Sequence, residues 1–437
     1  MEENDELVRL VRELNASVGR PAQPAASEPA TTPAPIPDAG ETAPSTPPAG
    51  GAPASDPVSE MPPSPPVPAP SEADEASQGA VESLRPTAEK LDAILARAVR
   101  ERASDVLLVA GFPPTVRVHG YLQAAGEDPL TPADTRLLAL LLLDETRYKD
   151  FQREKAIDFS FERAGGRFRC DVHLQRGSVA LALRAFPKRI PSLEELNLPP
   201  TLRRFTQLQR GLVLFVGPTG CGKSTSLAAL IEIINRSRSC HIVTIEDPIE
   251  YRHRPGRSLV EQIEIGRDAV SFPRALRHCL RQDPDVILVG EMRDLETIAI
   301  ALTAAETGHL VLSTLHTGDS TQTVDRIIDV FPGHQQNQVR QQLSLCLAGI
   351  VVQNLLPTAD GRGRHPACEI LLASDAIRNL IRSGKNHLIY SQVAMGKRDG
   401  MVTMEEALAE LYKAGRITLE EAALHAGHPE EFRKLAG

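Results

Sequence analysis

The sequence predicts an α/β protein in which a domain with a mostly parallel sheet follows a smaller α+β domain and a disordered tail. Three observations support this fold class. Apolar strand-like runs alternate with helical segments from about residue 203 onward. Shorter strand-like runs occupy residues 83–190. Residues 21–80 contain 17 of the 35 prolines, which favours disorder there.

Composition narrows the class of protein. The 437 residues are 41% hydrophobic, which is enough for two cored domains, and the formal net charge of -9 argues against nucleic acid as the main partner. The richest apolar run, residues 137–143, is too short to cross a membrane. The six cysteines form no Cys-x-x-Cys pair, so neither a zinc site nor a disulfide framework is predicted. We therefore expect a reduced, cytosolic protein.

The N-terminal part is predicted as a short amphipathic helix over residues 1–19 and a disordered Pro/Ala-rich linker over residues 20–82. Apolar side chains recur at the spacing of one helix face between Leu7 and Leu14. The linker cannot bury enough apolar surface to offset the entropy cost of ordering it. The helix is therefore expected to be tethered, either as a solvated tail or as a docking helix for a partner.

The first folded domain is expected over residues 83–190. A helical pattern of apolar residues runs from Leu91 to Val99. Strand-like runs follow it at residues 105–110, 115–118, 157–161, 167–174 and 179–185. Four prolines between Pro187 and Pro200 predict an interdomain linker, which we place at residues 191–202.

The second folded domain is expected over residues 203–437. Helical segments separate its apolar strands, and this alternation is typical of a mostly parallel sheet. The predicted strands are residues 212–216, 242–245, 286–289 and 310–314. From about Asp375 onward the pattern is helical and polar.

A phosphate-binding loop follows the first of these strands. Residues 217–224 fit the pattern G-x-x-x-x-G-K-[ST] and open a helical segment, which is the context that this motif requires; the alternative is a chance match in a turn. Such a loop directs backbone N–H groups at phosphate oxygens. We expect it to bind ATP, with Lys223 at the β- and γ-phosphates and Ser224 on Mg²⁺. The predicted cofactor-binding residues are Gly217, Pro218, Thr219, Gly220, Cys221, Gly222, Lys223, Ser224 and Thr225.

Acidic residues follow two further strands. Glu291 ends the third strand in a Walker B pattern, with Gly290 where Asp is usual, and is expected to polarise water or to hold Mg²⁺ through water. A solvated strand end is the alternative. Glu246, Asp247 and Glu250 crowd negative charge beside a proline turn, which indicates a cation site or a base. An acidic surface turn is the alternative for this second group.

Two histidines, His309 and His316, bracket the fourth strand. They either point at phosphate, couple neighbouring sites or have a structural role.

Two groups of arginines could contact a transferred phosphate. One group shares a helical stripe, and the other lies on strands of the first domain. The members are Arg274, Arg277 and Arg281 on the stripe, and Arg167, Arg169 and Arg184 on the strands. A charged stripe is usually a solvated face, whereas an arginine finger accelerates phosphoryl transfer by about 10³–10⁵. The residues alone leave both interpretations open.

These motifs, in this order, resemble the type II/IV secretion ATPase superfamily. The resemblance covers roughly residues 88–437. It rests on the phosphate-binding loop, on residues 244–250 (TIEDPIE) and 283–294 (DPDVILVGEMRD), and on a His box at residues 303–317. The four-cysteine zinc module typical of extension and secretion motors is absent from the sequence. Residues 376–382 are similar to a C-terminal helix motif of the type IV pilus retraction (PilT) family.

The resemblance implies a homohexameric ATPase with a PAS-like first domain and a RecA-like second domain. It implies a cytoplasmic ring, peripheral to the membrane at the cytoplasmic face of the inner membrane. The ring would act on a pilus platform protein and, through it, on pilin. The residues it assigns to catalysis are Glu291, Glu246, Glu250, His309, His316, Arg169 and Arg184, and those it assigns to the metal are Ser224 and Glu291.

Three positions depart from the family pattern without removing a charge. Cys221 replaces a serine, Ser226 a threonine and Ser313 a glycine. A thiol among N–H groups at a helix N-terminus is expected to have a lowered pKa, so we hypothesise that oxidation of Cys221 blocks ATP binding.

Two alternatives to a retraction motor are kept. The first is an accessory retraction motor or a secretion motor of the same superfamily, and the missing zinc module argues against secretion. The second is a nucleotide-dependent scaffold with little turnover, against which the intact Glu291 argues.

Overall fold

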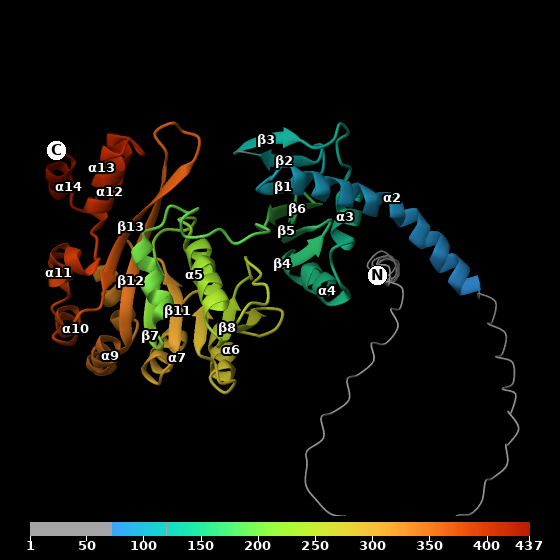
Figure 1. Cartoon of the computed structure of the whole chain (residues 1–437). Helices are drawn as coiled ribbons and strands as arrows, with labels where there is room; N and C mark the ends of the chain where they lie inside the picture. Colours follow the sequence, from blue (N-terminus) through green and yellow to red (C-terminus); the bar gives the residue numbers. More distant parts are fainter. Residues whose placement is uncertain (1–71, 119) are drawn as a thin grey trace, which may run out of the picture.

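The computed structural model describes residues 72–118 and 120–437, so the predicted helix at residues 1–19 and most of the predicted linker lie outside the described residues. The described residues form two sheets with helices packed on them, one sheet in each of two domains (Figure 1). The α/β fold class is confirmed. No helix among the described residues is both long and apolar enough to span a bilayer.

Helix α2 (Glu72–Arg100) leads into the first domain and extends away from it in Figure 1. The linker was predicted to reach residue 82, but α2 begins before that point. The reason is local, because residues 71–82 contain no proline and several good helix formers. The second half of α2 buries Leu91, Leu95 and Ala98, as the apolar spacing predicts.

The first domain is an antiparallel six-stranded sheet in the order β3-β2-β1-β6-β5-β4, on which α2, α3 and α4 pack. Its other elements are β1 (Asp105–Val109), β2 (Thr115–Val118), β3 (Tyr121–Ala124), α3 (Pro132–Leu140), α4 (Glu145–Glu154), β4 (Ala156–Arg163), β5 (Gly166–Gln175) and β6 (Ser178–Ala185). Arg169 on β5 pairs directly with Arg184 on β6, so the register places two predicted site residues side by side.

The second domain is a seven-stranded sheet in the order β13-β12-β7-β11-β10-β8-β9. All its strand pairs are parallel except β12 with β13 at the edge. Its elements are η1 (Pro200–Gln207), β7 (Gly211–Val216), α5 (Lys223–Ser237), β8 (His241–Glu246), β9 (Leu259–Glu264), α6 (Phe272–Cys279), β10 (Val286–Val289), α7 (Leu295–Glu306), β11 (Leu310–Leu315), α8 (Ser320–Asp329), α9 (Gly333–Cys346), β12 (Leu347–Pro357) and β13 (Arg364–Leu372).

Both faces of the second sheet are covered. Helix α5 and η1 pack on one face, and α6 to α9 pack on the other. Every residue of the central strands β7, β10 and β11 is therefore buried, which explains their continuous apolar sequences. The helical C-terminal part consists of α10 (Asp375–Arg382), η2 (Asn386–Leu388), α11 (Ile389–Met395), η3 (Gly396–Asp399), α12 (Met404–Lys413), α13 (Leu419–His425) and α14 (Pro429–Ala436).

The buried face of α2 gives a stability prediction. Leu95 is 0% exposed in the core of the first domain. Leu95→Ala should lower the free energy of unfolding by about 2–5 kcal/mol, because it removes buried methyl groups and leaves a cavity. Denaturant unfolding followed by circular dichroism measures the loss. The exposed Glu89→Ala on the same helix is the control, and equal stability of the two variants would contradict the packing of α2.

Candidate nucleotide site

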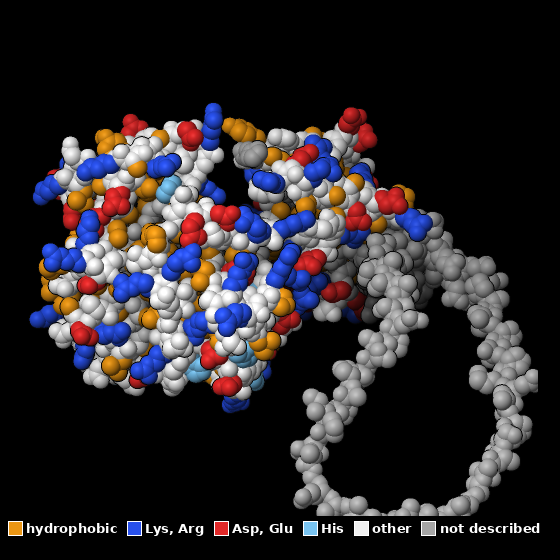
Figure 2. All heavy atoms as spheres, viewed as in Figure 1, with side chains coloured by type: hydrophobic (Ala, Val, Ile, Leu, Met, Phe, Trp, Pro, Cys, Tyr) orange, Lys and Arg blue, Asp and Glu red, His pale blue; other side chains and the backbone are white. Residues whose placement is uncertain are grey.

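The candidate site lies where β7, β8, β10 and β11 end, at one edge of the parallel sheet. A cleft of about 860 Å³ opens there, and residues of both domains line it. Figure 2 shows a hollow between the two domains with charged side chains around it. The predicted residues in its lining are Thr219, Gly220, Gly222, Lys223, Ser224, Thr225, Glu246, Glu250, Glu291, His316, Arg169 and Arg184.

The phosphate-binding loop depends on glycine torsions. Gly217, Gly220 and Gly222 have φ angles of 140°, 81° and 93°, which other residues rarely adopt. A Cβ on Gly217 would lie 2.3 Å from the carbonyl oxygen of Gln353. Helix α5 begins at Lys223, so its free N–H groups and positive dipole end face the cleft, as an anion site requires.

Lys223 lies buried within the loop. Its side-chain Nζ donates hydrogen bonds to the carbonyl oxygens of Gly217 at 2.8 Å and Pro218 at 3.0 Å. Burial lowers the pKa of Lys223, and nearby Cys221 and Glu291 oppose that shift. The ammonium is thus held close to the amides that would surround a phosphate.

Cys221 does not have the reactive thiol that was hypothesised. Its side chain is 3% exposed, and burial raises the pKa of the thiol despite the opposing charge of Lys223. The amides at the helix N-terminus favour the thiolate, but desolvation of the buried thiol is the larger effect here. The expectation of a lowered pKa for the Cys221 thiol is therefore wrong.

Gln353 on β12 is a site residue that the sequence analysis missed. Its side-chain amide donates to the carbonyl of Cys221 at 2.6 Å and accepts from the hydroxyl of Ser226 at 2.8 Å. It is 3% exposed and ties Cys221 in the loop to Ser226 in the first turn of α5. The sequence gives one indication of this role, because Gln353 and Asn354 are two adjacent polar residues inside an otherwise apolar strand. The contact also explains how Ser226 serves in place of threonine.

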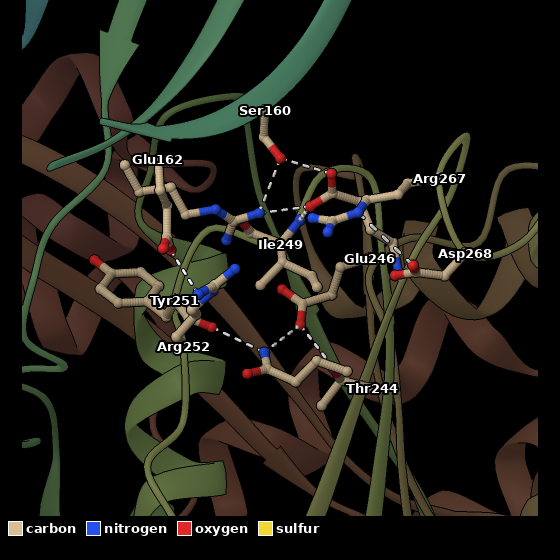
Figure 3. Close-up of polar contacts among 12 residues, drawn as sticks. Ser160, Glu162, Thr244, Glu246, Ile249, Tyr251, Arg252, Arg267 and Asp268 are labelled. Atoms are coloured by element: carbon tan, nitrogen blue, oxygen red, sulfur yellow. Dashed lines mark hydrogen bonds and ion pairs between the residues drawn. The ribbon is translucent and has the colours of Figure 1, made fainter. Parts of the chain in front are cut away.

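Glu246 ends β8 in a half-buried position. Its carboxylate accepts hydrogen bonds from Thr244 Oγ1 at 2.7 Å and from Gln262 Nε2 at 3.2 Å (Figure 3). Burial raises the pKa of Glu246 to about 7, although these hydrogen bonds favour the ionised form. Glu246 is therefore partly protonated near neutral pH and can accept or release a proton there.

Glu250 follows in the loop after β8. The hydroxyl of Ser224 is hydrogen-bonded to its carboxylate, and burial raises the pKa of Glu250. Burial also raises the pKa of the neighbouring Asp247, with Arg169 opposing the shift. The loop therefore brings Glu250 to Ser224 in the first turn of α5.

Glu291 follows β10 and faces the guanidinium of Arg293 and the imidazole of His316. Its carboxylate lies 2.7 Å from Arg293 Nε and 3.7 Å from His316 Nε2. Burial, and then the charge of Lys223, lower the pKa of His316. Gly290 has a steric reason to replace the usual Asp, because a Cβ there would approach the carbonyl oxygen of Ile245 to 3.2 Å.

The structure does not bring His309 to the cleft. It precedes β11, whereas His316 follows it, so the two lie roughly 20 Å apart at strand spacing. The imidazole of His309 is hydrogen-bonded to the carbonyl of Ala304, Nδ1 to oxygen, at 2.9 Å. Ser313, between them, is buried and donates to the carbonyl of Val289 at 2.7 Å, which accounts for the hydroxyl where glycine is usual.

The two groups of arginines differ in position. Arg169 and Arg184 line the cleft, with Arg169 paired to Asp158 at 2.8 Å and Arg184 73% exposed. The stripe on α6 does not line it, and Arg277 there pairs with Glu296.

Few protein side chains in the cleft could bind the predicted Mg²⁺ ion. Among the described residues, no group of three or more His, Cys, Asp or Glu side chains could hold a metal ion. Ser224 and Glu291 supply a hydroxyl and a carboxylate, and Mg²⁺ is characteristically held by one or two such oxygens together with phosphates and water. The residues present fit a nucleotide-bound Mg²⁺.

The clamp by Gln353 can be tested by substitution. Gln353→Met keeps the volume but removes the hydrogen bonds to Cys221 in the loop and to Ser226 on α5. At about 1 kcal/mol per bond, the dissociation constant for ATP should rise about thirtyfold. Titration with a fluorescent ATP analogue measures the change. Gln338→Met, at an exposed position on α9, is the control. Unchanged affinity in Gln353→Met would show that the loop holds its shape without the clamp.

The raised pKa of Glu246 gives a prediction for stability against pH. The native state binds a proton that the unfolded chain releases between pH 4.5 and about 7, so the free energy of unfolding should fall across this range. The total loss from Glu246 is at most about 3 kcal/mol. Glu246→Gln should flatten the slope measured by urea unfolding. Some slope should remain, because buried Glu369 also has a pKa raised to about 7; an unchanged slope would contradict the assignment.

Comparison with known proteins agrees with this site. Residues 178–424 match the family of type II/IV secretion system proteins. The chain is 44% identical to the type IV pilus retraction ATPase PilT of Pseudomonas aeruginosa, over 78% of this chain and 98% of that one. It is 42% identical to the type IV pilus ATPase PilU of the same organism, over 79% and 91%.

A solved structure agrees as well. The crystal structure of the pilus retraction motor PilT with bound ADP has a TM-score of 0.74 and 48% identity, and covers 78% of this chain and 98% of that one. A protein with this loop, these acids and these relatives is an ATPase. The chain belongs to the type II/IV secretion system protein family and, within it, to the twitching motility ATPases of the PilT type.

Proposed function

We propose that the chain is a Mg²⁺-dependent, ATP-hydrolysing motor that powers type IV pilus retraction and twitching motility. The observation that carries this proposal is the meeting of a phosphate-binding loop, Glu291 and first-domain arginines in one cleft. The similarity to a retraction ATPase over 98% of that relative's length supports the task of the motor.

Binding of ATP is assigned to the loop and Lys223. The amides at the start of α5 face the phosphates, and Lys223 exchanges its loop carbonyls for phosphate oxygens. Ser224 and Glu291 would hold Mg²⁺, which neutralises charge on the phosphate oxygens. The adjacent Glu250, hydrogen-bonded to Ser224, orients that hydroxyl.

Hydrolysis is assigned to Glu291 together with groups that stabilise charge. Glu291 polarises the attacking water, and Arg293 and His316 on either side of it hold its carboxylate in place. Arg169 and Arg184 face the same cleft from the first domain and compensate charge on the transferred phosphate. Because these arginines belong to the other domain, hydrolysis is coupled to the angle between the domains.

The assembly follows the family resemblance. We propose a cytoplasmic homohexamer at the face of the inner membrane, which acts on the pilus platform protein and indirectly on pilin. The second domain is proposed to be RecA-like, supported by six neighbouring parallel strands with the loop after β7. The first is proposed to be PAS-like, supported by an antiparallel sheet with helices packed on it.

Cells that lack this gene test the direction of force. We expect abundant surface pili without twitching, rescued by the wild-type gene but not by Lys223→Ala, which loses phosphate binding, or Glu291→Gln. The purified Glu291→Gln protein should still bind ATP through the loop and Lys223, while its kcat falls by about 10²–10⁴ because the carboxylate that activates water is lost. Bald cells would instead assign the chain to pilus assembly, and full turnover by Glu291→Gln would refute the role of that residue.

An accessory retraction motor is the second candidate. The identity of 42% to the type IV pilus ATPase PilU is close to the 44% to the retraction ATPase PilT, so the degree of similarity does not fix the task of the motor. Deletion cells that still twitch would favour the accessory role.

A further inference from the structure

A buried ion pair joins the two domains. Arg167 on β5 of the first domain contacts Glu264 at the end of β9 of the second, with 2.5 Å between Nη2 and Oε2. Their side chains are only 10% and 6% exposed. Burial lowers the pKa of Arg167, and the charge of Glu264 opposes that shift. The pair therefore belongs to the interior of the domain interface.

Ser160 and Asp268 make further hydrogen bonds to the residues of this ion pair. Ser160 on β4 donates to Glu264 Oε1 at 2.6 Å and accepts from Arg167 Nη2 at 3.0 Å (Figure 3). The backbone N–H of Glu264 donates to the carboxylate of Asp268 at 2.9 Å, which fixes the end of β9. Both oxygens of Glu264 thus have partners in the first domain.

The same ion pair holds the backbone of the acidic loop. The N–H of Ile249 donates to Glu264 Oε2 at 3.2 Å, and its carbonyl accepts from Arg167 Nη1. Ile249 directly precedes Glu250, whose carboxylate meets Ser224 at the start of α5. The backbone that precedes Glu250 is therefore held both by Glu264 of its own domain and by Arg167 of the first domain.

Arg167 also shares a strand face with a residue of the cleft. Arg167 and Arg169 are two residues apart on β5, so their side chains leave the same face of the sheet. Arg169 lines the nucleotide cleft. A displacement of β5 relative to β9 would move Arg169 and release Ile249 at the same time.

Burial of these charges points to positioning as their role. A buried ion pair is rarely more stabilising than apolar residues of the same volume. Removal of either partner, however, leaves the other charge buried and unpaired. Such a pair favours one arrangement of the domains over intermediate ones. An exposed pair nearby, Glu162 with Arg252 at 2.6 Å, also crosses between the domains but has side chains 49% and 56% exposed.

We propose that Arg167, Glu264 and Ser160 form an interdomain latch that positions the nucleotide site. When closed, the latch holds Glu250 at Ser224 and Arg169 at the cleft; when it opens, both groups leave together. The three are positioning residues, since they act through Ile249 and β5 and do not line the cleft. The proposal requires only that the protein hydrolyses ATP, and it does not depend on whether the motor retracts or assembles pili.

The test compares Glu264→Gln with Glu162→Gln in the full-length protein. Glu264→Gln should lower kcat about 10–100-fold, the effect of a small misplacement of catalytic groups. The Kd for ADP should stay within about threefold, because the phosphate-binding loop is untouched. Amide hydrogen exchange in the peptide that contains Ile249 should accelerate. Glu162→Gln, at the exposed pair, should leave kcat and exchange within about twofold of wild type.

A double variant separates positioning from folding. Arg167→Met/Glu264→Leu removes both buried charges, so its melting temperature should stay near that of the wild type even if Glu264→Gln unfolds. Its kcat should remain as low as predicted for Glu264→Gln, with ADP binding retained. The proposal is overturned if the folded double variant turns over ATP at the wild-type rate. It is equally overturned if kcat and ADP affinity fall together, which would show a general loss of structure.

Discussion

Parallel strands end on the same edge of a sheet, and this constraint places the reactive segments of the chain together. The phosphate-binding loop follows β7, the acidic loop follows β8, Glu291 follows β10 and His316 follows β11. The four strands are neighbours within one sheet and are buried along nearly their whole length, so the ends cannot shift independently. The buried strands therefore fix the positions of the site residues, and the loops that carry these residues need few further contacts.

The charged side chains that meet at this buried edge of the sheet have shifted pKa values. Burial raises the pKa values of Glu246 and Glu250 and lowers that of Lys223, so every shift disfavours the charged form. A site in this state favours a ligand that brings its own charges of both signs. A nucleotide triphosphate with a bound cation has that property, because its phosphates meet Lys223 while the cation meets the acids.

Local motifs allowed much of the site to be predicted. The loop at residues 217–224 and Glu291 depend on residues that are adjacent in sequence, and they are found where expected. Gln353 and Glu264 were missed because their partners lie 132 and 97 residues away, beyond any local pattern. His309 was grouped with His316 by spacing alone, although a strand between two residues separates them by its full length. Cys221 was misjudged because a sequence shows neighbours in the chain but not burial.

The two residues that sequence reasoning missed hold the two halves of the site. Gln353 fixes the phosphate-binding loop from within the second domain, so that half of the site is formed whatever the first domain does. Glu264 contacts the acidic loop, and Arg167 and Ser160 of the first domain contact the same carboxylate, so in the proposed latch this half of the site responds to the first domain. Binding and hydrolysis are therefore supported by different contacts. A motor needs this separation, because it must hold nucleotide while its domains move and hydrolyse it only in one of their arrangements.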